Sequence, residues 1–136
     1  MSDYYKDVTE YFNGKADQYD DVDVQLYWVL SDRFYKEVLK RELADFISKR
    51  PELKLLDAGA GTGRWTIFFH ELFDSERVAV SGTLIDISAD MLQVAKRKIA
   101  ERQWQEKYET MVGNIEQMNE VSNNNYDLSL SFYNVL

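Results

Sequence analysis

Cysteine is absent from this chain of 136 residues, and proline and histidine each occur only once. Without cysteine, the sequence excludes a disulfide framework, a zinc site built on thiolates and a cysteine nucleophile. His70 has no serine, aspartate or second histidine at a spacing typical of a catalytic group. We therefore interpret it as a helix-face residue without a catalytic role, and we expect no metal site.

Basic charge is also scarce, because 16 lysine and arginine residues stand against 24 acidic residues and leave a net charge of −8. Nonspecific binding to nucleic acid needs a basic face, so we expect no nucleic-acid partner, although this charge leaves room for a small RNA-binding patch. No apolar run is long enough to span a membrane, and residues 1–7 lack the apolar core of a signal peptide. We expect a cytoplasmic protein with no membrane partner.

The length predicts a single domain over residues 1–136, with a helical cap over 1–50 and an α/β core over 51–136. In the core, apolar runs that predict strands alternate with segments of helical periodicity. The predicted strands are residues 53–58, 78–87, 109–113 and 126–132, and the predicted helices are residues 65–73 and a segment that Ser88 caps. This alternation predicts a mostly parallel sheet with right-handed crossovers.

The cap is rich in aromatic residues. Apolar side chains at helical spacing between residues 4 and 12 predict a short amphipathic helix ended by Asn13-Gly14, and residues 16–21 are expected to form a loop or a short turn. Two interpretations of this segment stay open: a flap packed by its own aromatic side chains, or a lid over a ligand. Residues 23–49 predict a long helix whose apolar stripe we expect to cover the sheet or to lie in the core, through Tyr27, Leu30, Phe34 and Val38.

Three glycines at alternate positions, Gly59, Gly61 and Gly63, follow the first predicted strand and precede a predicted helix. Glycine allows a sharp backbone turn and the close approach of a ligand. The start of the helix behind the loop presents unpaired N–H groups. Strand, glycine loop and helix together indicate a nucleotide-type site.

The spacing around this loop separates the kinds of nucleotide site. A phosphate-binding loop of the GxxxxGK[ST] kind is excluded because no lysine follows Gly63. A dinucleotide site requires G-x-G-x-x-G, and Arg64 stands where its third glycine belongs. Asp86, at the end of the second predicted strand, can accept hydrogen bonds from both hydroxyls of a ribose. With Asp57 it places two carboxylates near the loop, which would repel a pyrophosphate.

The chain resembles the class I S-adenosylmethionine-dependent methyltransferases in four motifs that follow one another in the family's order. They are acidic-x-Gly-x-Gly-x-Gly at 57–63, an acidic strand end with Ser-x-x-Met-Leu-x-x-Ala at 86–95, and the fourth strand at 126–131, with Gly-Asn-Ile-Glu-Gln-Met at 113–118 in the place of the family's Gly-Asp-Ala-Glu-x-Leu. Residues 12–20 also resemble the Phe-x-x-x-Ala-x-x-Tyr-Asp segment of many small-molecule members. The resemblance implies a Rossmann-like three-layer α/β fold, S-adenosyl-L-methionine as cofactor, and methyl transfer to an O, N or C nucleophile of a small molecule.

The resemblance also assigns a cofactor site, composed of Tyr19, Asp57, Gly59, Ala60, Gly61, Gly63, Asp86, Ile87, Asn114, Ile115 and Phe132. It implies that the loop of residues 59–63 passes beside the methionine moiety and the ribose. Asp57 is expected to hold the loop and to face the ammonium group of the cofactor. Phe132 is expected beside the sulfonium, and Tyr19 belongs to the segment that covers the cofactor.

The adenosine end of the cofactor is assigned to the second and third motifs. The resemblance implies that Asp86 binds the ribose hydroxyls. It places Asn114 and the backbone N–H of Ile115 at the adenine edge, with Ile87 and Ile115 packed on the adenine faces. Asn114 stands where the family often has aspartate, and an amide oxygen can still accept a hydrogen bond from the adenine amino group.

The second departure from the family is length, since the sheet is expected to be truncated after the fourth strand, whereas the family's sheet has seven. We expect a fragment of a longer protein, or a homodimer that covers the exposed fourth strand. A non-catalytic cofactor-binding or interaction module and a nicotinamide oxidoreductase domain are the alternative functions. No catalytic residue is assigned, and four aromatic residues are candidates either for the acceptor pocket or for packing: Tyr11, Tyr19, Trp65 and Tyr133.

Overall fold

The computed structural model describes residues 3–118, 121 and 125–132, and its centre is a four-stranded sheet in the order β3-β2-β1-β4. All three strand pairs are parallel. The strands are β1 (Glu52–Ala58), β2 (Ala79–Asp86), β3 (Tyr108–Val112) and β4 (Leu128–Leu130). These boundaries confirm the predicted parallel α/β sheet.

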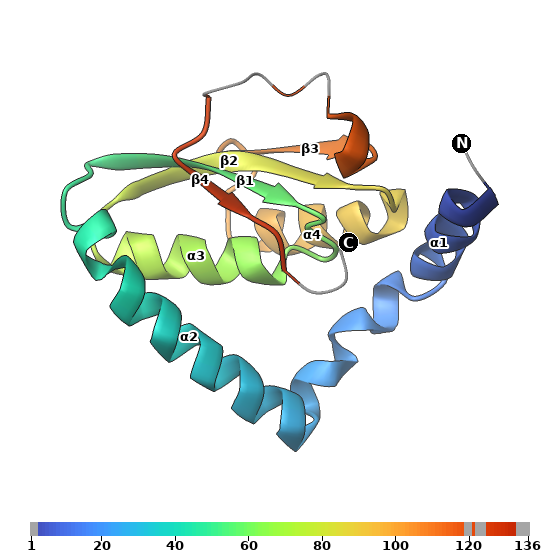
Figure 1. The fold of residues 1–136 in the computed structure, drawn as a ribbon, viewed down its shortest axis with the longest axis horizontal. Coiled ribbons are helices and arrows are strands. Elements are labelled where there is room, and N and C mark those ends of the chain that lie inside the picture. Colours follow the sequence, from blue (N-terminus) through green and yellow to red (C-terminus); the bar gives the residue numbers. More distant parts are fainter. Residues whose placement is uncertain (1–2, 119–120, 122–124, 133–136) are drawn as a thin grey trace.

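Two helices connect the first three strands and lie on one face of the sheet, α3 (Arg64–Ser75) and α4 (Ala89–Glu101) (Figure 1). Ser88 caps α4 as predicted, since its Oγ accepts a hydrogen bond from the backbone N–H of Met91 at 3.2 Å. The described residues add no α-helix on the opposite face. These residues thus form a two-layer core. Because β1 and β2 are parallel, their carboxyl ends meet at one edge of the sheet.

The main apolar core lies between the sheet and these two helices. Leu55 of β1 and Phe73 of α3 are completely buried in it. His70 of α3 is also buried, with Nδ1 2.6 Å from the hydroxyl oxygen of Tyr108 and its ring stacked on Trp104 at a centroid distance of 3.7 Å. His70 thus joins α3 to β3 and to the loop before it, which is a packing role.

The cap consists of α1 (Asp3–Asn13), the 3-10 helix η1 (Ala16–Val24) and α2 (Leu26–Ile47). The predicted helices are confirmed, while residues 16–21 form part of η1 instead of a loop. α1 contacts α4, and η1 contacts α2 and α4. No described helix has both the length and the apolar character needed to cross a membrane.

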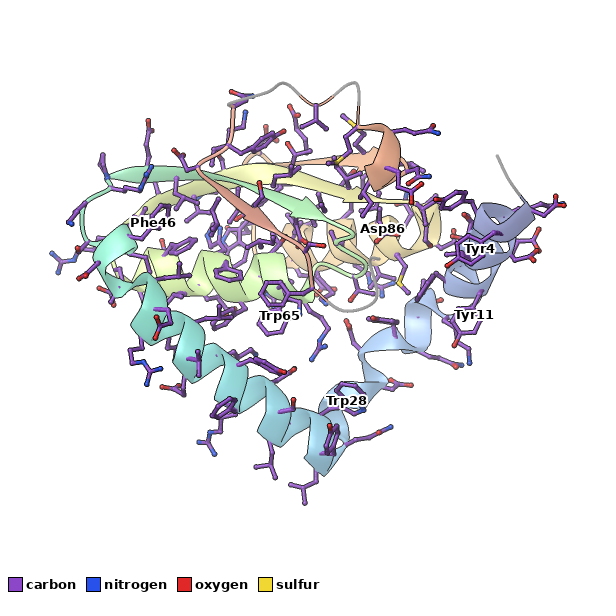
Figure 2. The ribbon with its side chains drawn as sticks, viewed as in Figure 1. Tyr4, Tyr11, Trp28, Phe46, Trp65 and Asp86 are labelled. Atoms are coloured by element: carbon purple, nitrogen blue, oxygen red, sulfur yellow. The ribbon has the colours of Figure 1, made fainter. Side chains whose placement is uncertain are left out.

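Only the C-terminal half of α2 packs on the core, through Leu39, Leu43, Phe46 and Ile47. The prediction that the N-terminal half lies in the core or on the sheet is wrong, because Tyr27 is 73% exposed and Phe34 is 67% exposed. The helix slants away from α3 toward η1, with Phe46 at the end near the sheet and Trp28 near the other end (Figure 2). Helical periodicity predicted the apolar stripe of α2, but not how much of the helix lies over the apolar core.

β4 is the edge of the described sheet on the β1 side. Its three residues pair with Leu55, Leu56 and Asp57 of β1. Leu130 is buried and Ser129 is exposed, so successive side chains of this strand point to opposite faces of the sheet. Beyond β4, Phe132 stacks on Trp65 of α3 at 4.3 Å between ring centroids.

Gly82 permits the close approach of β1 and β2. A Cβ atom at this position would lie 2.2 Å from the carbonyl oxygen of Leu55, and backbone cannot yield as a flexible side chain can. We expect Gly82→Ala to lower the free energy of unfolding by about 3 kcal/mol or more, measured by urea denaturation. Ser81→Ala on the same strand is the control, and an equally small effect of both substitutions would contradict this account.

Candidate functional site

The glycine loop lies at the carboxyl end of β1 and folds across the end of β2. All three glycines have a positive φ, between 53° and 81°, a region that favours glycine. The backbone N–H groups of Gly59 and Ala60 both donate to the carbonyl oxygen of Ile85, at 2.8 and 2.9 Å. The loop is therefore fixed by β2 as well as by β1.

Asp86, the last residue of β2, is the second anchor of the loop. Its Oδ2 accepts a hydrogen bond from the N–H of Gly61 at 2.7 Å, and its Oδ1 accepts one from the N–H of Ser88 at 2.8 Å. Partial burial raises the pKa of this carboxyl, and the backbone hydrogen bonds oppose the rise. A carboxylate has about four acceptor positions, so acceptor capacity remains for a ligand.

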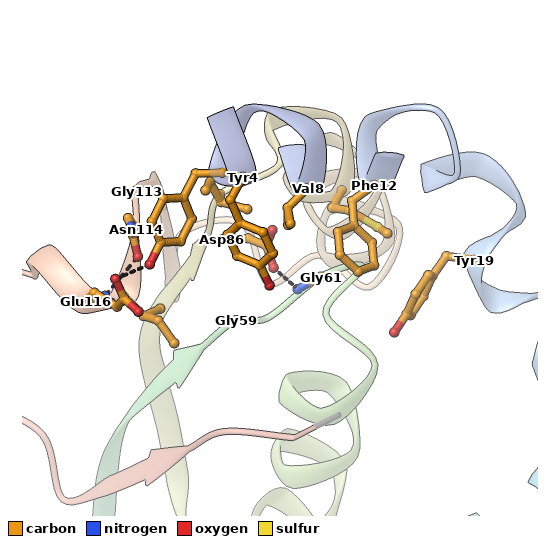
Figure 3. Close-up of a pocket in the computed structure, with 14 residues that line it drawn as sticks. Tyr4, Val8, Phe12, Tyr19, Gly59, Gly61, Asp86, Gly113, Asn114 and Glu116 are labelled. Carbon is orange, nitrogen blue, oxygen red and sulfur yellow. Dashed lines mark hydrogen bonds between the residues drawn. The ribbon is translucent and has the colours of Figure 1, made fainter. Parts of the chain in front are cut away.

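A cavity of about 180 Å³ opens at this edge of the sheet (Figure 3). It is lined by the glycine loop, the end of β2, the segment after β3 and α1. Seven of the predicted cofactor residues line it: Tyr19, Gly59, Gly61, Asp86, Ile87, Asn114 and Ile115. The structure thus brings together residues that lie as far apart in the sequence as 19 and 115.

The face of α1 toward this cavity was not among the predicted site residues. Tyr4, Val8 and Phe12 line the cavity from above the loop (Figure 3), and Tyr5 lines the same cavity. Their helical spacing is the signal that could have identified them. Phe12 and Tyr19 pack on a small core around Met91, which agrees with a flap packed by its own aromatic side chains. α1 also covers the cavity, and its action as a lid over a ligand stays a prediction.

Asn114 has a partner within the chain. Its Oδ1 accepts a hydrogen bond from the N–H of Glu116 at 2.9 Å and so caps the 3-10 helix η2 (Ile115–Gln117). The hydroxyl of Tyr5 in turn donates to the carboxylate of Glu116. This contact ties α1 to η2 across the cavity.

A smaller cavity lies beside the first and is also lined by Tyr19, Gly59 and Gly61. Six further residues line it: Asp57, Ala60, Thr62, Arg64, Trp65 and Phe132. Of the aromatic candidates, Tyr19 and Trp65 thus line a cavity, Tyr11 is 61% exposed and lines neither, and Tyr133 lies outside the described residues. Gly63 lines neither cavity.

Gly63 has a packing role at the start of α3. A Cβ atom there would lie 3.2 Å from Cβ of Ala95, so the glycine lets the loop approach α4 closely. Its carbonyl oxygen accepts the N–H of Ile67 at 3.0 Å, which begins the hydrogen bonding of the helix.

Asp57 is the most deeply buried carboxyl of the site, with 2% of its surface exposed. Its Oδ2 accepts a hydrogen bond from the hydroxyl of Thr66 at 2.6 Å, which holds the first turn of α3. Burial raises the pKa of Asp57 to about 6, and the negative charge of Asp86 adds to the rise. A positively charged ligand group would favour the ionised form.

A polar network fastens the cap to the loop, and sequence patterns gave no signal for it. Asp20 of η1 accepts a hydrogen bond from the hydroxyl of Thr62 at 2.6 Å and pairs with Lys98 of α4 at 2.7 Å. Arg64 pairs with Asp32 of α2. These partners lie between 32 and 78 positions apart in the sequence, beyond the reach of helical periodicity.

Comparisons with known proteins agree with this geometry. The family model described as methyltransferase domain matches residues 55–136, which include the glycine loop, Asp86 and Asn114. No curated protein matches the sequence.

Three solved structures share the fold. A Methanococcus maripaludis protein assigned as an S-adenosyl-L-methionine-dependent methyltransferase aligns with a TM-score of 0.62 and 19% identity, over 86% of this chain and 48% of that one. A Galdieria sulphuraria protein assigned as a sarcosine dimethylglycine methyltransferase has a TM-score of 0.58, 23% identity, and coverage of 70% and 34%. The Streptomyces coelicolor geranyl diphosphate C-methyltransferase aligns with a TM-score of 0.56 and 16% identity, over 84% of this chain and 48% of that one.

This chain therefore spans about half or less of the length of these structures. The likeness, below 25% identity in each case, establishes a shared Rossmann-like fold. Because the family model covers more than half of the sequence, the chain belongs to the methyltransferase-domain family.

Proposed function

We propose that the two cavities hold S-adenosyl-L-methionine and that the protein transfers its methyl group to a nucleophile of a small molecule. The observation that carries this proposal is the carboxylate of Asp86, which holds the glycine loop through Gly61 and also lines the larger cavity. The Streptomyces coelicolor structure contains S-adenosyl-L-homocysteine, which supports the same cofactor here.

The larger cavity fits the adenosine end of the cofactor. Asp86 has acceptor positions for the two ribose hydroxyls, as a carboxylate with two backbone partners allows. Ile87 and Ile115 line the same cavity and offer apolar surface to the faces of a base. The Oδ1 of Asn114 already caps η2, so we assign base recognition to its amide N–H groups and to the segment around Ile115.

The smaller cavity fits the methionine end. Asp57 lines this cavity, and burial raises the pKa of its carboxyl. An ammonium or sulfonium cation nearby would lower that pKa again and favour the carboxylate. The stacked rings of Phe132 and Trp65 offer a π face to a cation. Arg64 also lines this cavity, but its guanidinium already pairs with Asp32, and the carboxylate of Asp57 disfavours a phosphate here. This weakens the alternative of a nicotinamide dinucleotide.

When bound, the cofactor supplies an electrophilic methyl group on its sulfonium. The chain's own contribution is position, because the loop is held by Ile85, Asp86 and Asp20 before any ligand arrives. α1 covers the larger cavity and limits the access of water. A non-catalytic cofactor-binding module would show the same binding without turnover, so an assay of methyl transfer to a panel of amine, hydroxyl and carbon acceptors separates the two.

Calorimetry with S-adenosyl-L-homocysteine tests the cofactor proposal. We expect binding by the wild type, and we expect Asp86→Ala to weaken it by about tenfold to a hundredfold through loss of charge-assisted hydrogen bonds. Asp90→Ala, which removes an exposed carboxyl from the first turn of α4, is the control and should leave the affinity unchanged. No binding by the wild type at about millimolar ligand would overturn the proposal.

The pH dependence of stability tests the environment of Asp57 without any ligand. The pKa of Asp57 is about 6 in the folded state against an ordinary value of 3.8. Between these two pH values the folded protein keeps a proton on Asp57 that the unfolded chain has lost. Stability contributed by this group therefore falls as the pH rises from about 4 through 6, by up to about 3 kcal/mol. Asp57→Asn keeps an acceptor for Thr66 without the charge and should gain stability over the wild type across this range.

Urea denaturation of both proteins at several pH values measures this difference. Ser81→Ala, which removes no titratable group, is the control and should show a flat difference from the wild type. A flat difference for Asp57→Asn as well would contradict the raised pKa.

The free edge of β4 supports a further proposal, that the chain forms a homodimer through this strand. β4 pairs with β1 on one side, and the described residues provide no strand on the other. Unpaired N–H and C=O groups at such an edge can pair with another strand. Sedimentation velocity at about 10 μM should show a dimer, and a single monomeric species would rule this assembly out.

A further inference from the structure

A separate cavity of about 540 Å³ lies between α2, α3 and α4. We call it the α2 groove. It shares Arg64 with the smaller cofactor cavity and no residue with the larger one. The residues that line it are Asp20, Val29, Asp32, Arg33, Lys36, Glu37, Lys40, Arg64, Ile67, Lys98 and Arg102.

The charge of the α2 groove is opposite to that of the whole chain. Six of its lining residues are basic and three are acidic, which leaves a local charge of +3 in a protein with a net charge of −8. The basic residues come from three helices and converge on one space. On α2 they occupy positions 33, 36 and 40 of one helical face, and Lys98 lies on α4, with Arg102 directly after the end of that helix.

Most of these cations already have a carboxylate partner. Lys98 pairs with Asp20, Arg64 pairs with Asp32, and Lys40 pairs with Glu37 at 3.2 Å. Arg102 lies 3.8 Å from Glu71, which is outside the groove. The three acidic residues of the groove are thus engaged in holding other groups.

Arg33 and Lys36 are the exceptions. Among the described residues, neither has a carboxylate within ion-pair distance, and the ammonium group of Lys36 lies over the ring of Phe68, 5.3 Å from its centroid. This contact places Lys36 in the groove and leaves its donors available. Two adjacent cations without internal partners, in a space that further cations surround, form a site for an anion.

We propose that the α2 groove binds a phosphate-bearing small molecule, as a ligand separate from the cofactor. The guanidinium of Arg33 matches phosphate geometry with two parallel donors, and Lys36 adds a point charge. The volume admits more than a single inorganic ion. The acidic residues in the lining and the negative charge of the rest of the surface disfavour an extended nucleic-acid backbone, so the ligand is a compact anion.

Titration calorimetry with inorganic pyrophosphate, at constant ionic strength, tests this inference. We expect the wild type to bind with a dissociation constant below about 1 mM, and the double variant Arg33→Ala/Lys36→Ala to lose at least about tenfold in affinity. The matched control is Arg41→Ala/Lys49→Ala, which also removes two positive charges, from exposed positions outside the groove. The control should change the affinity by less than about twofold.

Two results would overturn the proposal. One is the absence of binding to the wild type at about 10 mM pyrophosphate, and the other is an equal loss in both double variants, which would indicate unspecific attraction. Urea denaturation of each variant verifies that the fold is kept, and Arg33→Lys/Lys36→Arg, which preserves both charges, should retain binding. Because neither Arg33 nor Lys36 lines either cofactor cavity, the effect of their substitution is independent of the S-adenosyl-L-homocysteine titration.

Discussion

The carboxylate of Asp86 is the interaction on which the candidate site depends. It joins the glycine loop to the segment that starts α4, by accepting one N–H from Gly61 and another from Ser88. Charge-assisted hydrogen bonds of this kind contribute about 1.5–3 kcal/mol each. The same carboxylate lines the cavity, so the group that shapes the loop is also the group that a ligand would meet. Loop geometry and ligand recognition therefore cannot vary independently in this fold.

Within the cap, α1 is attached by polar contacts more than by buried apolar surface. α1 has no buried residue, and its ends are held by Tyr5 on Glu116 and by Asn13 Oδ1, which accepts the Ser88 hydroxyl at 2.5 Å. A segment with few buried contacts opens locally at a lower free energy than the core does. The cavity beneath α1 can thus exchange ligands without disturbing the sheet.

Sequence patterns predicted the parts of the molecule that local chemistry determines. Apolar runs located the strands, Ser88 marked the start of α4, and the alternate glycines placed the loop. The patterns failed where the outcome depends on partners far along the chain. The exposure of Tyr27 and Phe34 follows from how far α3 extends beneath α2, and the contacts of Asp20 join three segments that no short-range rule connects.

The two halves of α2 are held by opposite kinds of force. Ile47 and its neighbours bury apolar surface, whereas the N-terminal half is tied down through the ion pair of Asp32 with Arg64. Added salt screens an ion pair, and a salting-out anion such as sulfate strengthens apolar burial. The pair of Asp32 and Arg64 is largely shielded from solvent, so salt weakens it less than it weakens an exposed ion pair. The two ends of α2 therefore respond to such a salt to different degrees.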